Sequence, residues 1–225
     1  MNRDLTTLHT ISPTGLRGGP TLLLLHGFGA DERDLFGLIS PLDVPPHWDI
    51  LSIRAPLPVP EMTGASWFPF DPKTKRGGVA EALDGLDDEA IAKSLQLLLN
   101  TLDQKVPTSK IVPIGFSQGA VMAAELLRAR PERVPAAVLL SGFVLPTQNS
   151  SVESDAKLTE LERQVFFGWG EQDDSSISRA AFHLTEDWLK RHTKAEIHRF
   201  PELGHEISMD ELREVRDFLE RLRIR

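Results

Sequence analysis

The sequence of 225 residues contains no cysteine. This absence removes disulfide frameworks, zinc–thiolate sites and a cysteine nucleophile together, and it fits a reducing compartment. Long apolar runs are also missing, since stretches such as Ala136–Leu140 are far too short to cross a bilayer. Met1–Thr10 includes Arg3 and Asp4 but lacks the apolar core of a signal peptide. We therefore expect a cytoplasmic protein with no stable membrane insertion.

Positive charge is scarce compared with negative charge. Lysine and arginine total 25 against 33 aspartate and glutamate residues, which gives a formal net charge of -8 without any basic block. Such a chain does not match a phosphate backbone, so nucleic-acid binding is not expected. The length suits one domain over residues 1–225 with a substantial core.

Short apolar runs alternate with amphipathic segments along the chain. Thr21–Leu25 is typical of a strand covered on both faces, and Asp87–Leu102 of an amphipathic helix capped by Asp87. The alternation predicts an α/β fold, a mostly parallel central sheet with helices on both faces. Further strands are expected at Leu5–Ser12 (an edge), Asp49–Ile53, within Ile111–Gly119, and at Ala137–Leu140, Gln164–Phe167 and Ala195–Phe200. Further helices are expected at Glu32–Ile39, with Asp31 as cap, and at Ala120–Arg130, Ser178–Arg191 and Met209–Leu222.

Two segments are expected to depart from this regular pattern. Val144–Leu158 is polar and predicts a surface connector without chemistry. Pro113 lies in the central strand, where its missing N–H cannot join the ladder. A local bulge is therefore expected at Pro113.

The stretch 115–119 reads Gly-Phe-Ser-Gln-Gly and lies between a strand and a helix. In that context Gly-x-Ser-x-Gly indicates a sharp turn that exposes the serine above the sheet. Glycine is needed two residues on either side because the turn leaves no room for side chains. The helix N-terminus also favours negative charge at Ser117. Ser117 is thus a candidate nucleophile, and the alternative is a plain strand–helix turn.

A serine nucleophile needs a base, and the imidazole of histidine suits this role. His205 lies in an exposed corner between the last strand and the last helix. His26 also ends a strand near the site, but it precedes the serine, so we assign it a role in orienting its loop. The other histidines are expected on the surface or in satisfied structural positions: His9, His47, His183, His192 and His198.

The carboxylate that would orient His205 is expected after the strand Gln164–Phe167. Asp173, three residues after Gly170, is favoured, and the adjacent Asp174 remains the alternative. The resulting order Ser…Asp…His is that of the α/β hydrolases. A carboxylate in this position holds the required histidine tautomer and stabilises the imidazolium.

An acyl-transfer site also requires hydrogen-bond donors aimed at the developing oxyanion. The N–H of Gln118, directly after the serine, is one candidate, and the N–H of Phe28 is the other. Phe28 belongs to the turn His26–Gly29, whose alternative role is that of a glycine-rich turn alone.

Taken together, these segments resemble the phospholipase/carboxylesterase family, which includes the acyl-protein thioesterases, within the α/β-hydrolase superfamily. The resemblance covers nearly the whole chain in order and is carried by Leu25–Gly29, Arg54–Pro56, Ser66–Phe68, Gly115–Gly119, Ser141-Gly142, Gly170–Asp173 and Gly204-His205. It implies a small serine esterase without a separate lid domain or a cofactor.

Residue by residue, the resemblance implies Ser117, Asp173 and His205 as the triad and the N–H groups of Phe28 and Gln118 as the oxyanion hole. It also suggests that Trp67 and Phe68 line the acyl pocket, for which the alternative is that they only plug their loop onto the sheet. Asp174 replaces a proline of the family pattern, and this leaves the identity of the acid open.

The function expected is hydrolysis of short-to-medium acyl carboxylic esters, with thioesters left open, through an acyl-enzyme on Ser117. The substrate would be a small-molecule ester or acyl-thioester, and a homodimer is left open. No metal is expected, because no His, Asp and Glu set has zinc-site spacing. The alternatives are a non-catalytic small-molecule-binding protein that retains the fold, and an acyl-protein thioesterase or lysophospholipase.

Overall fold

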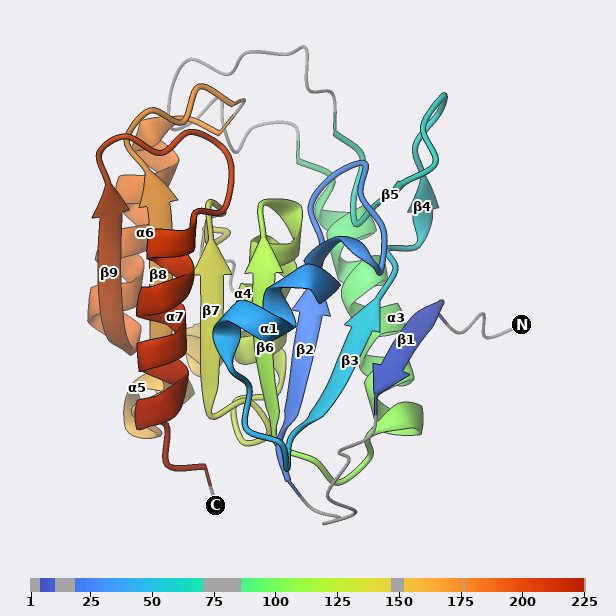
Figure 1. Ribbon diagram of the computed structural model, residues 1–225, viewed down its shortest axis with the longest axis horizontal. Helices are drawn as coiled ribbons and strands as arrows, with labels where there is room; N and C mark the ends of the chain where they lie inside the picture. The colour runs from blue at the N-terminus through green and yellow to red at the C-terminus, as the bar shows by residue number, and fades with distance from the viewer. Residues whose placement is uncertain (1–4, 11–18, 71–85, 147–151, 176, 225) are drawn as a thin grey trace.

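The computed structural model describes residues 5–10, 19–70, 86–146, 152–175 and 177–224. Within these ranges a seven-stranded sheet forms the middle layer of the molecule (Figure 1). Its strands, in spatial order, are β1 (Thr7–Thr10), β3 (Asp49–Ile53), β2 (Thr21–Leu25), β6 (Ile111–Phe116), β7 (Ala136–Leu140), β8 (Gln164–Gly170) and β9 (Lys194–Phe200). All neighbouring pairs are parallel except the edge pair β1–β3, which is antiparallel. The short strands β4 (Leu57–Pro58) and β5 (Ala65–Ser66) form a separate pair.

Helices cover both faces of the sheet, as the alternation of the sequence predicts (Figure 1). One face carries the 3₁₀ helix η1 (Asp34–Leu38), α1 (Ile39–Leu42) and α7 (Met209–Arg221). The other face carries α3 (Asp88–Lys105), α4 (Gln118–Ala129), α5 (Val152–Glu160) and α6 (Arg179–His192). The α/β class is therefore confirmed. Among the described helices, none has the length and apolar character that crossing a membrane requires.

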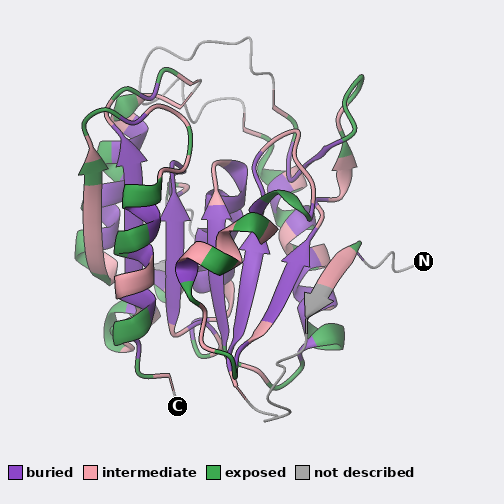
Figure 2. Cartoon of the chain, viewed as in Figure 1, coloured by how far each residue is buried: buried purple, intermediate pink, exposed green. Residues whose placement is uncertain are grey.

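Strand β2 shows how the sheet separates two apolar cores. Leu22 and Leu24 pack into the core beneath α7, whereas Leu23 and Leu25 pack into the core beneath α3 and α4. Successive side chains of a strand point to opposite faces, so a strand covered on both sides must be apolar throughout. Figure 2 shows the central strands as buried along their length. Each such leucine contributes roughly 1.5–3 kcal/mol of burial free energy.

Two expectations about local structure are corrected. The segment Val144–Leu158, expected to be a connector, includes most of the helix α5. One polar residue of this helix, Asp155, is buried and accepts hydrogen bonds from Arg128 Nε at 3.0 Å and from Trp188 Nε1 at 3.0 Å. The first helix after β2 is a 3₁₀ helix that begins at Asp34, and Asp31 accepts the N–H of Arg33 at 2.8 Å in the preceding turn.

Pro113 does not cause the expected bulge. Its register with Leu23 of β2 continues without an offset from Ile111 to Gly115. The ladder between β6 and β7 begins only at Ile114, so Pro113 lies outside that pairing. The missing N–H of proline therefore need not interrupt the sheet at this position.

Candidate active site

The turn from β6 into α4 has the geometry that its glycines predict. Ser117 adopts φ 55 and ψ -118, a backbone conformation that is unusual for a residue with a side chain. A Cβ on Gly115 would lie 2.2 Å from the carbonyl oxygen of Gly119, and one on Gly119 would lie 1.9 Å from that of Leu25. Only glycine fits at both positions. The Ser117 N–H donates to the carbonyl oxygen of Leu140 at 2.9 Å, which ties the turn to the end of β7.

The three residues expected to act together do meet at the carboxyl end of the sheet. Ser117 Oγ lies 3.0 Å from His205 Nε2, and His205 Nδ1 lies 2.7 Å from Asp173 Oδ2. They follow β6, β8 and β9, which are separated along the chain but end at the same edge. An ionised carboxylate can only accept, so Nδ1 carries the proton and Nε2 is free to accept the Ser117 hydroxyl.

Asp173 is held as a buried anion. Its side chain is fully buried, and the N–H of Ser175 donates to its second oxygen at 2.9 Å. Burial alone would raise the pKa of Asp173, but the interactions with His205 and Ser175 outweigh it and bring the pKa below its ordinary value. Asp174, the alternative acid, is exposed and instead lines the neighbouring pocket.

Of the two residues whose backbone N–H groups are named from the sequence, Phe28 lines the pocket and Gln118 directly follows the pocket residue Ser117. Gln118 is the first residue of α4, so its N–H has no acceptor within the helix. Phe28 lies in the turn after β2 and lines the pocket together with Ser117 and His205. Beside it, the N–H of Gly29 donates to the carbonyl oxygen of Ala65 at 2.9 Å, which anchors the turn to β5.

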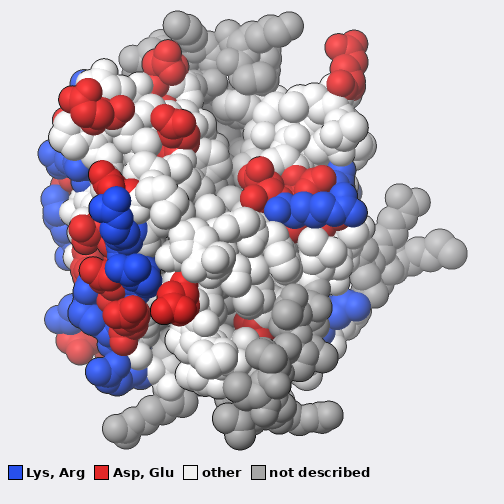
Figure 3. Space-filling model, viewed as in Figure 1, with Lys and Arg blue, Asp and Glu red and all other residues white. Residues whose placement is uncertain are grey.

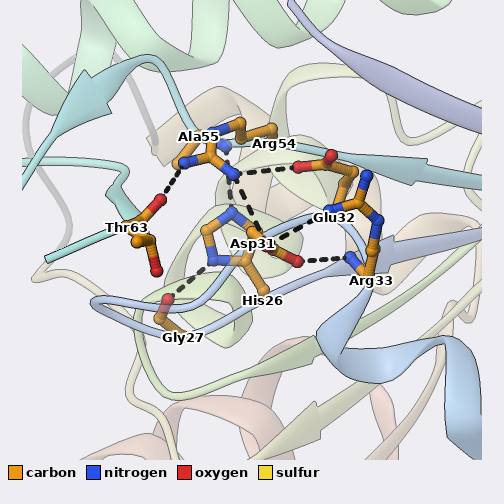
Figure 4. Close-up of polar contacts among 8 residues, drawn as sticks. All are labelled: His26, Gly27, Asp31, Glu32, Arg33, Arg54, Ala55 and Thr63. Atoms are coloured by element: carbon orange, nitrogen blue, oxygen red, sulfur yellow. Dashed lines mark hydrogen bonds and ion pairs between the residues drawn. The ribbon is translucent and has the colours of Figure 1, made fainter.

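His26 has no free ring nitrogen with which to act as a base. Its Nδ1 donates to the carbonyl oxygen of Gly27 at 2.7 Å, and its Nε2 accepts the N–H of Ala55 at 3.0 Å (Figure 4). The side chain is 1 % exposed, and burial lowers the pKa of His26 below its ordinary value. A neutral His26 therefore joins the end of β2 to the segment after β3, as its predicted orienting role requires.

Arg54 fixes the outer part of the same loop. Its guanidinium contacts Glu32 at 3.1 Å and Asp31 at 3.7 Å, and it donates to the carbonyl oxygen of Thr63 at 2.5 Å (Figure 4). This one side chain links the segments after β2, after β3 and between β4 and β5. The Phe28 turn is thereby held from two directions.

Trp67 and Phe68 belong to the core and are not among the described residues that line the pocket. Trp67 Nε1 donates to the carbonyl oxygen of His26 at 2.9 Å, and the rings of Trp67 and His26 lie 5.7 Å apart. The side chain of Gln118 accepts the Trp67 N–H at 3.0 Å and donates to the carbonyl oxygen of Phe68 at 3.0 Å. These contacts match the alternative in which both residues fasten their loop, because every one of them is directed inward.

The pocket beside Ser117 has a volume of about 330 Å³. Phe28 and Phe70 meet edge to face on its wall, with ring centres 5.4 Å apart. Among the described residues, its lining consists of Gly27, Phe28, Ala30, Asp34, Phe70, Phe116, Ser117, Asp174, Ser175, Ile177 and His205. The lining of the cavity is thus largely apolar. Its polar members are Ser117 and His205 and the two carboxylates of Asp34 and Asp174.

Several of these lining residues were not singled out from the sequence. Phe116 occupies a variable position of the Gly-x-Ser-x-Gly turn. Its position directly before the serine is the sequence feature that could have identified it as a pocket residue. Ser175 follows Asp173 by two residues, the spacing at which an aspartate accepts a backbone N–H. Asp34 and Ile177 gave no such signal, since only the folded loops bring them to the serine.

The strand order, the turn at Ser117 and the contacts of His205 define an α/β-hydrolase fold. A family model for phospholipases and carboxylesterases matches residues 7–223, and the chain belongs to this family. Membership supports esterase activity in general and implies a small-molecule ester as substrate. Comparison with curated protein sequences gives no match.

Solved structures share the fold over nearly the full length of the chain. Esterase PE8 is 24% identical with a TM-score of 0.77, covering 97% of this chain and 99% of its own. The Bacillus cereus carboxylesterase is 23% identical with a TM-score of 0.74, covering 96% and 93%. An acyl-protein thioesterase 2 from Zea mays is 20% identical with a TM-score of 0.74, covering 96% and 97%. At these identities the likeness shows the fold alone.

Proposed function

We propose that the protein is a serine carboxylesterase that hydrolyses small esters through an acyl-enzyme on Ser117. The observation that carries this proposal is the continuous path from Ser117 Oγ to His205 Nε2 at 3.0 Å and from His205 Nδ1 to Asp173 at 2.7 Å. Each distance is that of a hydrogen bond, and the carboxylate on Nδ1 leaves Nε2 facing the serine hydroxyl. No cofactor is required, because the chain itself supplies nucleophile, base and acid.

In the first half of the reaction, Ser117 Oγ attacks the ester carbon while His205 Nε2 takes its proton. The tetrahedral intermediate collapses, the ester C–O bond breaks, and His205 gives the proton to the leaving oxygen. In the second half, water attacks the acyl carbon and passes its proton to His205, which returns it to Ser117 as the acid is released. Asp173 stays ionised throughout and stabilises the imidazolium.

The negative charge on the carbonyl oxygen develops next to the N–H groups of Phe28 and Gln118. Donors of this kind contribute roughly 2.7–4 kcal/mol each to transition-state stabilisation in related chemistry. Their fixed position has a visible basis. Arg54 and His26 hold the segment that carries Phe28, and the buried Gln118 side chain fastens α4 to the Trp67 loop.

The pocket favours short-to-medium acyl groups. A volume of about 330 Å³ is near the lower end for small-molecule sites. Each methylene buried there adds up to about 0.8 kcal/mol of binding until the cavity is filled. Thioesters react by the same steps, and the likeness to the Zea mays acyl-protein thioesterase 2 keeps them within the proposal.

Labelling by a fluorophosphonate probe tests the proposal, because the probe reacts with activated serines only. Wild type should be labelled and lose activity toward p-nitrophenyl butyrate. Ser117→Ala should remain unlabelled, while Ser40→Ala, which removes an exposed serine on α1, should label like wild type. A folded wild type that is neither labelled nor active would favour the alternative of a non-catalytic binding protein.

A further inference from the structure

Two carboxylates in the pocket are not used by the reaction described above. Asp34, at the start of η1, and Asp174, directly after Asp173, both line the cavity that holds Ser117 and His205. Both are exposed to solvent, and neither forms an ion pair with a described residue. Among the described residues, the cavity therefore presents two carboxylates that have no ion-pair partner.

The arginines nearest to them in the sequence are directed elsewhere. Arg33, beside Asp34, approaches Asp31 at 4.0 Å, and Arg179 donates to the carbonyl oxygen of Glu171. No lysine or arginine is among the described residues of the lining. Figure 3 shows carboxylates on both sides of the pale hollow at the upper end of the molecule. Basic side chains lie directly beneath the carboxylates on the right, and most of the others lie lower down, over α7.

The rest of the lining is rich in aromatic rings. Phe28, Phe70 and Phe116 contribute their rings to the same cavity. The face of an aromatic ring attracts a cation, most strongly where water is partly excluded. Rings and carboxylates together form an environment that favours an ammonium group and disfavours an anion of the same shape.

The position of Asp174 indicates which part of an ester would carry the cation. His205 must reach the leaving oxygen in order to protonate it, so the leaving alcohol lies on the His205 side of Ser117. Asp174 belongs to the loop that holds His205 through Asp173. A charge on the alcohol therefore passes close to Asp174, with Asp34 on the opposite loop.

We propose that the pocket selects esters whose alcohol carries an ammonium group, with Asp174 and Asp34 as the residues that determine this specificity. The inference rests on the proposed esterase function. The bond changes are those of ester hydrolysis: Ser117 Oγ takes the acyl group, the alcohol C–O oxygen takes the proton from His205, and the ammonium group leaves unchanged. Water then releases the acid.

The test compares two esters of the same acyl group and nearly the same shape. Butyrylcholine carries a trimethylammonium group, and 3,3-dimethylbutyl butyrate carries a neutral tert-butyl group in its place. The ratio of their kcat/KM values isolates the charge. We expect wild type to prefer the cationic ester on the order of tenfold at low ionic strength, with a ratio that falls as salt is added.

The variants Asp174→Asn and Asp34→Asn remove one charge each while nearly keeping the shape of the side chain. Each should lower the ratio several-fold, and the double variant should bring it close to one. Glu202→Gln is the matched control, since it removes an exposed carboxylate three residues before His205 in the sequence that is not part of the described lining. Its ratio should equal that of wild type.

A wild-type ratio of one or less, or an unchanged ratio in the double variant, would overturn the inference. So would turnover of p-nitrophenyl butyrate without turnover of either alcohol ester. Failure of all three esters, with no labelling by fluorophosphonate, would instead refute the esterase function itself. An equal fall of the ratio in Glu202→Gln would show that overall charge, and not the pocket, sets the preference.

Discussion

Two histidines lie at the same edge of the sheet, one after β2 and one after β9, and their surroundings differ in every respect. His26 is buried, and both of its ring nitrogens contact backbone groups. His205 is partly exposed, with one nitrogen on the buried carboxylate of Asp173 and the other on Ser117. The residue type is the same, yet of the two only His205 has a nitrogen that faces Ser117, the proposed nucleophile.

The difference lies in what each ring nitrogen can exchange. A backbone carbonyl or N–H cannot give up or take a proton at neutral pH, so it locks His26 in one neutral form. A carboxylate on one nitrogen and a hydroxyl on the other let His205 gain a proton and lose it again. Proximity to the site is therefore insufficient to identify a base, and the partners of both nitrogens are needed.

The largest expected effect separates these two histidines. His205→Ala should lower kcat on the order of a millionfold, because the nucleophile loses its base. His26→Ala should mainly lower the free energy of unfolding, by about 1–3 kcal/mol for the Ala55 N–H that it leaves unpaired. Ester hydrolysis and thermal melting measured on both variants check this. A folded but inactive His26 variant beside a nearly normal His205 variant would reverse the assignment.

The second expected effect concerns the carboxylate behind His205. Asp173→Asn should cost on the order of ten-thousandfold in kcat, because an amide at this position favours the wrong histidine tautomer. Asp174→Asn should cost far less with p-nitrophenyl butyrate, since the carboxylate on His205 Nδ1 is that of Asp173. The opposite ranking of the two variants would move the acid by one residue.

The third expected effect extends the comparison to the aromatic loop. Trp67 is buried and donates a hydrogen bond to the backbone of His26. Trp67→Ala should therefore leave a cavity in the core and lower the free energy of unfolding by about 3–5 kcal/mol. Phe70 lines the pocket, and Phe70→Ala should flatten the dependence of kcat/KM on acyl length. Melting curves and a series of p-nitrophenyl esters distinguish the two. A stable Trp67 variant with altered acyl preference would return Trp67 to the pocket.

The smallest expected effect compares two buried carboxyl groups. Unlike Asp173, Glu211 is buried without an ion-pair partner among the described residues, and burial, offset only in part by a backbone hydrogen bond at Ser208, raises the pKa of Glu211 to about 8 from an ordinary 4.5. The folded state then holds a proton that the unfolded state has released, so stability should fall as pH rises from about 4.5 to 8.

Glu211→Gln should remove this loss, because glutamine keeps the shape of the neutral acid. In the middle of that range the gap between variant and wild type should grow by up to about 1.4 kcal/mol per pH unit, or roughly 3–6 °C in Tm. Thermal melting between pH 5 and 9 measures it. Parallel curves for the two proteins would show that Glu211 is already ionised or already paired.

The sequence predicts the order of strands and helices well, for a physical reason. Buried parallel strands must be apolar on both faces, and Thr21–Leu25 displays this directly. The carboxyl ends of such strands lie at one edge, so the order of the elements predicts that Ser117, His205 and one of the two aspartates at 173 and 174 meet there. The glycines at 115 and 119 mark the turn itself, because no other residue fits there.

What the sequence could not show depends on packing between distant segments. The polar stretch that forms α5 looks like a connector, because the partner of Asp155 is an arginine on another helix. Trp67 looks like a pocket residue until its N–H groups are traced to His26 and Gln118. Asp34 and Ile177 reach the pocket only through the path of their loops.

In the turn at Ser117, the residues that the backbone geometry constrains are different from the residue whose side chain would react. Gly115 and Gly119 are fixed by carbonyl oxygens that lie too close for any Cβ, so almost every substitution there should abolish folding of the turn. The side chain of residue 117 projects into the pocket toward His205, and its backbone needs only to accept φ 55 and ψ -118. Evolution can therefore replace the proposed nucleophile at position 117 by another side chain, such as cysteine or aspartate, without changing the backbone of the turn. The two flanking glycines, in contrast, can hardly be replaced at all.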